Sequence, residues 1–254
     1  MKEFLNKIML GDAAAIMASM PENSIDLTIT SPPYDNLRDY KGYHFDFENI
    51  AANLYRVTKA GGVVVWVVGD ATVKGSETCT SFKQALHFKE IGFNLHDTMI
   101  WVKTSPYPAN VRYQQDFEYM FIFSKGKPAT FNPLQERKSE KEIQKILKGQ
   151  ANPITKTYRN KDGSIVRPDE AAKKRLINAS NRLMKNRSNV WRMNAGYMIN
   201  SKDIISYEHP ASFPEELAEN HILSWSNEGD TILDCMCGSG TVLKMATLHN
   251  RKFV

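Results

Sequence analysis

Apolar blocks alternate with polar segments along the chain, and their spacing predicts strands and helices in turn. Continuous β-branched or aromatic stretches are typical of strands covered on both faces. Apolar positions three and four residues apart are typical of amphipathic helices. We predict strands over 25–30, 63–68, 98–103, 117–124 and 231–235 and a strand opening at 252, and helices over 13–20, 47–57, 81–91, 214–226 and 242–249.

Strands that alternate with helices indicate an α/β protein with a Rossmann-like, doubly wound mixed sheet. Loops break the pattern where prolines or glycines follow a strand, as in Ser31-Pro32-Pro33-Tyr34 and Gly238-Ser239-Gly240. Ser212 and Glu215 lie three residues apart, which predicts a capping box at the start of the helix 214–226.

The composition is that of an ordinary globular protein: 42% of the 254 residues are apolar and 24% are charged. The longest apolar run, 63–68, is far shorter than the ~20 residues that a bilayer requires, and the N-terminus lacks a secretory signal. The three cysteines make no disulfide framework, and Cys235 and Cys237 have no second pair of metal-ligand spacing. We therefore expect buried thiols, no metal and a cytoplasmic location.

Positive charge is concentrated in the middle of the chain. Residues 125–205 contain 19 Lys and Arg against 7 Asp and Glu, whereas the whole chain has a net charge of only +5. A solvated surface loop and a polyanion-binding insert both account for this excess. Apolar residues such as Ile143 and Trp191 indicate that the segment folds.

A first candidate site follows the strand 25–30. Two prolines there fix the backbone, so that the Pro32 carbonyl and the Ser31 hydroxyl can accept hydrogen bonds next to the Tyr34 ring. Ligands of open α/β sheets bind at the carboxyl ends of strands. Two acceptors beside an aromatic ring suit a flat base with an exocyclic NH₂, although an ordinary Pro-Pro turn has the same sequence.

A second candidate site is the segment from Asp234 to Thr241, where a strand leads through Gly238 and Gly240 into a helix. Glycines allow a tight turn and the close approach of a ligand to the backbone. The third glycine of the dinucleotide fingerprint is missing, so the segment alone is also compatible with a simple strand-to-helix turn.

Together these segments resemble the S-adenosylmethionine-dependent DNA amino-methyltransferases, and their order resembles the circularly permuted β group of that family. The resemblance implies a class I methyltransferase fold, S-adenosylmethionine as cofactor and double-stranded DNA as substrate. It assigns catalysis to Ser31, Pro32, Pro33 and Tyr34. It assigns cofactor binding to Asp12, Thr30, His209, Pro210, Ala211, Ser212, Phe213, Asp234, Cys235, Gly238, Ser239, Gly240 and Thr241.

The resemblance also divides the chain. Residues 1–124 are expected to form the catalytic part, 125–205 the basic target-recognition insert, and 206–254 the cofactor-binding part. The expected DNA contacts are Arg38, Lys41, Arg112, Lys173, Lys174, Arg175, Arg182, Lys185, Arg187 and Arg192. Enzymes of this kind come from bacteria or phages, and a homodimer and a cognate restriction enzyme are further partners that the resemblance allows.

Two departures from the family pattern concern the cofactor. Cys235 and Met236 stand where the family usually has Pro and Phe, which predicts a looser pocket. The sequence ends at Val254, just before the acidic residue that would hold the ribose, so the ribose is expected to bind more weakly or through other groups unless the sequence is truncated.

The base is expected to be cytosine, modified at N4, because serine begins the catalytic motif; adenine N6 is the alternative. Carbon-5 methylation is disfavoured, because this chain has no Pro-Cys pair. RNA modification and a catalytically degenerate DNA-binding relative stay open. Glutamine-modifying relatives normally place the cofactor loop before the catalytic loop, the reverse of the order found here.

Overall fold

The computed structural model describes residues 1–33, 45–104, 111–148, 158–159, 162, 164–166, 178, 182–196, 198–209 and 212–254. These residues form two compact units. The first, which we call the core unit, consists of Met1–Asn132 and Ser188–Val254. The second, which we call the insert unit, is Pro133–Arg187 and lies within the predicted insert 125–205.

The core unit contains a seven-stranded mixed sheet of the order β11-β5-β6-β2-β1-β12-β13. Strand β6 runs antiparallel to both of its neighbours, and every other pairing is parallel. The predicted fold class is therefore confirmed. The strands are β1 (Ile25–Thr30), β2 (Thr58–Val68), β5 (Asn94–Lys103), β6 (Phe117–Ser124), β11 (Val190–Met193), β12 (Thr231–Leu233) and β13 (Lys252–Phe253).

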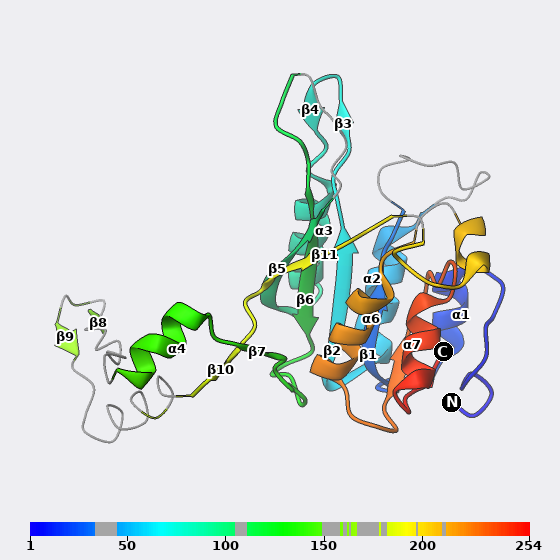
Figure 1. Ribbon diagram of the computed structural model, residues 1–254. Coiled ribbons are helices and arrows are strands. Elements are labelled where there is room, and N and C mark those ends of the chain that lie inside the picture. Colours follow the sequence, from blue (N-terminus) through cyan, green and yellow to red (C-terminus); the bar gives the residue numbers. More distant parts are fainter. Residues whose placement is uncertain are drawn as a thin grey trace. The chain divides into compact units, whose positions relative to one another are not determined.

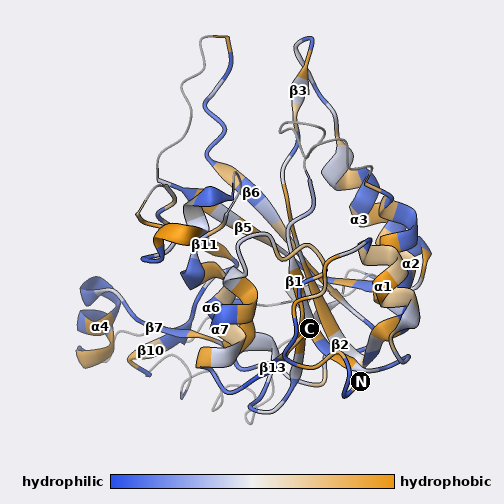
Figure 2. Ribbon diagram, turned by 90° about the vertical axis from the view of Figure 1, so that its right-hand side faces the viewer, coloured by the Kyte–Doolittle hydropathy of each residue, from blue (hydrophilic) through white to orange (hydrophobic). Residues whose placement is uncertain are grey.

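Helices cover both faces of this sheet (Figure 2). On one side lie α1 (Ala13–Ser19), α2 (Phe47–Val57) and α3 (Thr80–Glu90), and on the other lie α6 (Glu215–Trp225) and α7 (Thr241–Leu248). The first group packs on a fully buried aromatic core around Trp66 and Phe88, whose rings are 5.0 Å apart. Burial on both faces explains why the central strands are continuous apolar runs.

Strands β1 and β12 are neighbours although some 200 residues separate them in the sequence. They pair in parallel, with Leu27 opposite Ile232 and Thr28 opposite Leu233. The carboxyl ends of both strands therefore lie at the same edge of the sheet. Strand β2 pairs in parallel with the other side of β1 and ends at that edge as well. We call it the carboxyl edge.

The start of α6 differs from the prediction. The N-cap is Pro214, and no side chain caps the helix, so the predicted Ser212–Glu215 capping box is wrong. The Glu215 carboxylate instead accepts hydrogen bonds from Ser201 and Lys244. Tertiary partners outcompete the local cap because a lysine and a buried hydroxyl both reach this carboxylate.

Strand β11 lies within the segment predicted as the insert, but it belongs to the main sheet. It pairs in parallel with β5, and Trp191 is only 4% exposed. The Trp191 ring lies 4.7 Å from the ring of His221 on α6. Trp191 is therefore an anchor of the core unit, although it lies within the predicted insert.

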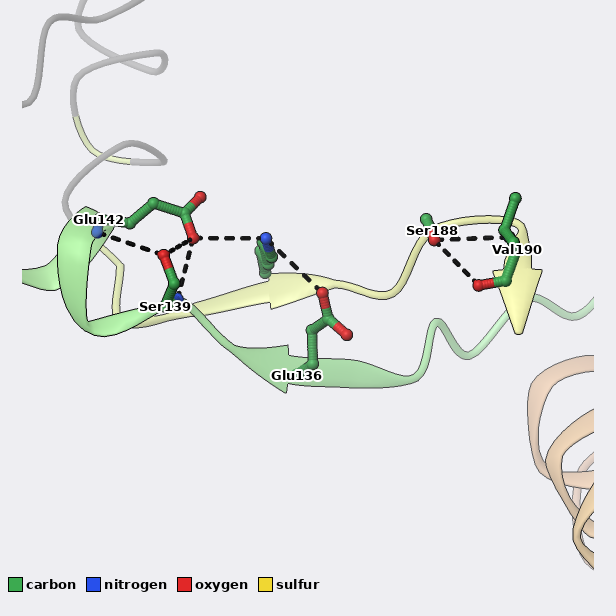
Figure 3. Close-up of polar contacts among 6 residues, drawn as sticks. Glu136, Ser139, Glu142, Ser188 and Val190 are labelled. Atoms are coloured by element: carbon green, nitrogen blue, oxygen red, sulfur yellow. Dashed lines mark hydrogen bonds and ion pairs between the residues drawn. The ribbon is translucent and has the colours of Figure 1, made fainter. Parts of the chain in front are cut away.

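The insert unit is built on the antiparallel pair β7 (Gln135–Arg137) and β10 (Met184–Asn186), with α4 (Glu140–Leu147) and a second pair, β8 (Tyr158–Arg159) and β9 (Ile165–Val166). A capping box joins Ser139 to Glu142 at the start of α4 (Figure 3). These hydrogen bonds lower the pKa of Glu142 to about 2. Glu142 and Glu136 both form ion pairs with Lys185, at 3.5 and 3.6 Å, which ties α4 to the β7–β10 pair.

Candidate active site

The two candidate loops meet at the carboxyl edge, where β1 and β12 end. The Thr30 hydroxyl donates a hydrogen bond of 2.8 Å to Oδ1 of Asp234, and both side chains are buried. The same carboxylate oxygen accepts the backbone N–H of Met236 at 3.1 Å. The residue that precedes the Ser31-Pro32 turn is thus bonded directly to the first residue of the glycine turn, as the sequence interpretation requires.

Burial controls the protonation of the Asp234 carboxyl in this contact. Desolvation raises the pKa of Asp234 to about 7, although the Thr30 hydroxyl and the Met236 N–H act in the opposite direction. Burial, together with the negative charge of Asp234, raises the pKa of the neighbouring Cys235 to about 12. A positively charged ligand beside Asp234 would favour its ionised form. Part of the Cys235 and Cys237 side-chain surface stays accessible to solvent, although burial governs the pKa of both thiols.

Two glycines of the turn adopt left-handed backbone conformations. Gly238 has a φ of +47°, and a Cβ built on it would lie 2.9 Å from Cε1 of His209. Gly240 has a φ of +79° and precedes the first residue of α7. Glycine is needed at 238 both for its φ and because the His209 ring packs against its backbone. His209 begins the second predicted cofactor segment, so this packing joins that segment to the turn.

Further contacts hold the second cofactor segment against α7. Lys244 on α7 forms ion pairs with Asp203 at 2.6 Å and with Glu215 at 2.8 Å, and these pairs raise its pKa. The buried Asn200 side chain donates to the carbonyl and the hydroxyl of Ser212. Phe213 follows and is half-buried, whereas Pro210 and Ala211 lie outside the described residues.

A pocket of about 70 Å³ opens beside Asp234 and Cys235, the two predicted cofactor residues that line it. Apolar side chains from the N-terminal segment and from α1 form most of it, α7 contributes only Leu243, and Asp234, Cys235 and Cys237 close one side. Its lining is Lys7, Ile8, Met9, Gly11, Ala13, Ile16, Met17, Met20, Leu233, Asp234, Cys235, Cys237, Leu243 and Val254. Asp12 caps α1 next to this lining, where its side chain accepts the N–H of Ala15 at 2.8 Å.

The chemistry of this pocket fits S-adenosylmethionine. The cofactor combines an apolar-faced adenine with a positively charged sulfonium and ammonium group. The apolar lining suits the ring, and the buried carboxyl of Asp234 suits the positive charge. Among the described residues no group of three or more His, Cys, Asp or Glu could hold a metal ion.

The predicted catalytic loop begins at the same edge. Ser31 and Pro33 are half-buried and Pro32 is buried, directly after Thr30. Tyr34, Arg38 and Lys41 lie outside the described residues. Ser31 and Pro32 thus directly follow the strand end that is bonded to Asp234, the residue where the glycine-turn segment begins.

The predicted DNA contacts are divided between the units. Arg182, Lys185 and Arg187 belong to the insert unit, and Arg112 and the exposed Arg192 belong to the core unit. Arg112 donates to Oγ1 of Thr72 and to the carbonyl of Gly75. Lys173, Lys174 and Arg175 lie outside the described residues.

Sequence reasoning missed the pocket residues Ile8, Met9 and Leu243, and it missed Lys244, which pairs with Asp203 and Glu215. The apolar pair Ile8-Met9 just before Gly11 was a signal that could have been used. Lys244 gave none, because a lysine on a helix is usually solvated.

This mixed sheet, with the strand ends before the proline turn and the glycine turn bonded to each other at its carboxyl edge, has the fold of solved DNA methyltransferases. The chain belongs to the N6/N4 DNA methylase family, whose model, described as DNA methylase, matches residues 25–254. It is therefore a DNA methyltransferase with S-adenosylmethionine as cofactor. No helix of the described residues is long and apolar enough to cross a membrane.

Two relatives illustrate the range of similarity. The orphan methyltransferase M.BamHII of Bacillus amyloliquefaciens is 55% identical over 236 residues, which cover 91% of this chain and 83% of that protein. The type II methyltransferase M.BglII of Bacillus subtilis is 27% identical over 262 residues, 99% of this chain and 65% of that protein.

Solved structures share the fold. The PvuII DNA methyltransferase, which is cytosine-N4-specific, superposes with a TM-score of 0.62 at 21% identity, over 96% of this chain and 78% of that one. A Thermus thermophilus protein solved with S-adenosyl-L-methionine gives a TM-score of 0.56 at 25% identity, over 96% of this chain and 85% of that one.

Proposed function

We propose that this enzyme transfers a methyl group to the N4 amine of a specific cytosine in double-stranded DNA. The Thr30–Asp234 hydrogen bond is the observation that carries the proposal, because it joins the catalytic loop to the cofactor turn. The choice of cytosine rests on Ser31 as the first residue of the catalytic motif. The exocyclic amine of a stacked base is inaccessible, so the target must be flipped out of the duplex.

The chain's own groups would orient the amine. The Ser31 hydroxyl and the Pro32 carbonyl would accept its two N–H bonds, and this leaves the nitrogen lone pair aimed away from both acceptors. Pro33 follows Pro32, so the backbone is fixed before the base arrives, and Tyr34 would stack on the ring. Alignment of this kind supplies much of the rate in a group transfer.

The bound cofactor supplies an electrophilic methyl group on a sulfonium. The residues proposed to hold it are Asp12, Thr30, His209, Ser212, Phe213 and Asp234, the turn from Gly238 to Thr241, and Cys235 at the wall of the pocket. The negative charge of Asp234 would face the positively charged part of the ligand.

Nucleoside mass spectrometry of DNA from cells that express the protein tests the reaction and the base together. We expect N4-methylcytosine, its loss in Ser31→Ala, and its retention in the matched control Ser19→Ala on the exposed face of α1. Finding N6-methyladenine as the sole new mark would overturn the choice of base. Methylation-aware sequencing of the same DNA gives the recognition site.

We propose the insert unit as the region that recognises the target. Residues 133–187 contain 15 Lys and Arg against 6 Asp and Glu, an excess that suits a phosphate backbone. Lys185 is held in ion pairs with Glu136 and Glu142, so the exposed Arg182 is the better candidate for contact. Charge reversal at Arg182 should weaken binding of DNA and leave binding of the cofactor unchanged.

A catalytically degenerate DNA-binding protein is the second candidate, favoured by Cys235 in place of the family's proline. Calorimetric titration with S-adenosylmethionine separates the two, because a degenerate relative would give no heat of binding in a folded sample. We propose two further partners: a second copy of this chain, which would make a homodimer, and a cognate restriction enzyme. Light scattering of the purified protein tests the dimer.

A further inference from the structure

Two exposed arms stand on the carboxyl edge, the edge that also carries Ser31 and Pro32. The hairpin arm is formed by β3 (Thr72–Val73) and β4 (Ser76–Glu77), which follow β2. The second arm is the segment 111–116, which precedes β6. Figures 1 and 2 show both arms projecting past the ends of the strands.

The hairpin arm ends in a two-residue turn, Lys74-Gly75. The φ angles of these residues are +49° and +84°, the left-handed values that a type I′ turn requires. Asn or Gly is preferred at the first of these positions, and a lysine there is disfavoured. Turn chemistry therefore does not explain Lys74, which places a positive charge at the tip of the arm.

The root of the hairpin arm is fixed to the core unit. The Asp70 carboxylate accepts the backbone N–H of Ser81 at 2.8 Å and the Ser81 hydroxyl at 2.5 Å, at the start of α3. The N–H of Thr78 closes the root on the carbonyl of Ala71 at 3.0 Å. An exposed hairpin held in this way keeps a defined position without a partner.

Arg112 links the two arms. Its guanidinium donates to Oγ1 of Thr72 at 2.8 Å and to the carbonyl of Gly75 at 3.1 Å. The root of the second arm is fixed by the N–H of Lys103, which donates to the carbonyl of Asp116 at 2.6 Å. Arg112 is thereby used as a brace, which differs from the phosphate contact that the sequence suggested.

The surface of the arms is apolar near the ends. Val111 is 92% exposed, Tyr113 is 99% exposed and Val73 is 54% exposed. The acidic residues lie at the roots, where Glu77 pairs with Thr72 and Asp116 adjoins β5. Positive charge beside apolar side chains suits DNA, since proteins that deform a duplex insert such side chains between its base steps.

We propose that the braced arms bind duplex DNA beside the target base, with Tyr113 and Val111 against the unstacked bases and Lys74 on a phosphate. The inference rests on the proposed function, because the arms stand on the edge of the sheet that carries Ser31 and Pro32, which would receive the flipped base. It adds an interaction surface outside the insert unit. Arg112 acts on DNA through the position of the arms.

Two substitutions test the surface, each with a matched control at the opposite edge of the sheet. Tyr113→Ala is compared with Leu248→Ala, another exposed apolar side chain, and Lys74→Glu with Lys89→Glu at the far end of α3. DNA affinity is measured by fluorescence anisotropy over a range of salt, methyl transfer by initial rates, and cofactor affinity by calorimetry.

We expect Tyr113→Ala to lower kcat/KM for DNA roughly tenfold, the loss of one aromatic contact with a base. Lys74→Glu should weaken DNA binding. It should also reduce the slope of the logarithm of DNA affinity against the logarithm of salt concentration by about one, because one fewer counterion is released. Cofactor affinity and both controls should be unchanged. Arm variants that match their controls would overturn the proposal. Anisotropy measures DNA binding without turnover. Failure of the arm proposal can therefore be told apart from failure of the proposed function, in which the wild-type enzyme would methylate another base or none.

The brace is tested through its partner. We expect Arg112→Ala to lower activity. Thr72→Val removes one acceptor of Arg112 and leaves its charge in place, so it should reproduce part of that loss. Arg112→Lys should not restore activity, because one ammonium group cannot span the two acceptors as the guanidinium fork does. A neutral Thr72→Val together with rescue by Arg112→Lys would show that Arg112 contacts phosphate directly, which would overturn the bracing role.

Discussion

Thr30 donates its hydroxyl hydrogen to Asp234 across 2.8 Å, although the two residues are 204 positions apart. This hydrogen bond lies between the ends of two adjacent parallel strands, one of which leads to the proposed catalytic loop and the other to the cofactor turn. It couples the position of the base-binding loop to the ionisation of a buried carboxyl.

Replacing Thr30 with Val keeps the shape of the side chain and removes the donor. The carboxyl then loses a partner in a buried site, so the free energy of unfolding of the cofactor-free protein should fall by about 1–3 kcal/mol at pH 8. The loss should be smaller at pH 5, where the carboxyl is protonated. Urea denaturation at both pH values measures this, and an equal loss at both would contradict the role of the ionised group.

Asp234→Asn should change how stability depends on pH. The pKa of Asp234 in the folded protein, about 7, lies above its ordinary value of 3.8. The folded state therefore retains a proton that the unfolded state releases, and this carboxyl lowers stability as pH rises from about 4 to about 7. The asparagine side chain does not titrate, so the variant lacks this pH-dependent loss of stability. The difference in unfolding free energy between variant and wild type should grow in favour of the variant across that window.

Gly238→Ala should destabilise the cofactor-free protein more than Gly240→Ala does. Both glycines have positive φ, which costs an alanine about 1–2 kcal/mol. Only at 238 would the new Cβ also meet the His209 ring, at 2.9 Å, whereas nothing lies within 4 Å of a Cβ at 240. In a His209→Ala background the two substitutions should cost the same, and a persistent difference in urea denaturation would refute the contact.

His221 should make the protein sensitive to acid. Burial lowers its pKa to about 3 from an ordinary 6.5, and its Nδ1 has no hydrogen-bond partner in the part of the chain that the structure describes. The unfolded state takes up the proton first, so this side chain lowers stability as pH falls from about 6.5 toward 3. His221→Leu should shift the midpoint of acid unfolding to lower pH, as followed by circular dichroism. A variant that unfolds at the same pH as the wild type would count against this.

The thiols should differ in reactivity. Cys79 is exposed, whereas burial raises the pKa of Cys235 to about 12 and also raises the pKa of Cys237. Because the thiolate is the reactive form, a disulfide reagent at pH 8 should modify one cysteine quickly and the other two slowly. Cys79→Ser should abolish the fast phase. A fast phase that survives in Cys79→Ser would show that Cys235 or Cys237 ionises readily.

Local periodicity predicted most elements of the main sheet and its helices. The observed bounds of α2 and β6 are those predicted, 47–57 and 117–124, because both are long stretches with a clear apolar pattern. The hairpin arm and β11 were not predicted. Their strands are only two to four residues long, which is too short for an alternation of apolar and polar residues to be recognised.

The sequence by itself determined the α/β class, the order of the two motifs and the basic middle of the chain, since these depend on residues close together in the chain. Only the tertiary structure decided that β1 lies beside β12, that Glu215 pairs with Lys244 instead of capping a helix, and that Arg112 braces the hairpin arm. Burial of Asp234, and with it its raised pKa, was decided there too. The physical reason is that strand pairing and desolvation arise from contacts between distant segments, which no local pattern of apolar and polar residues specifies.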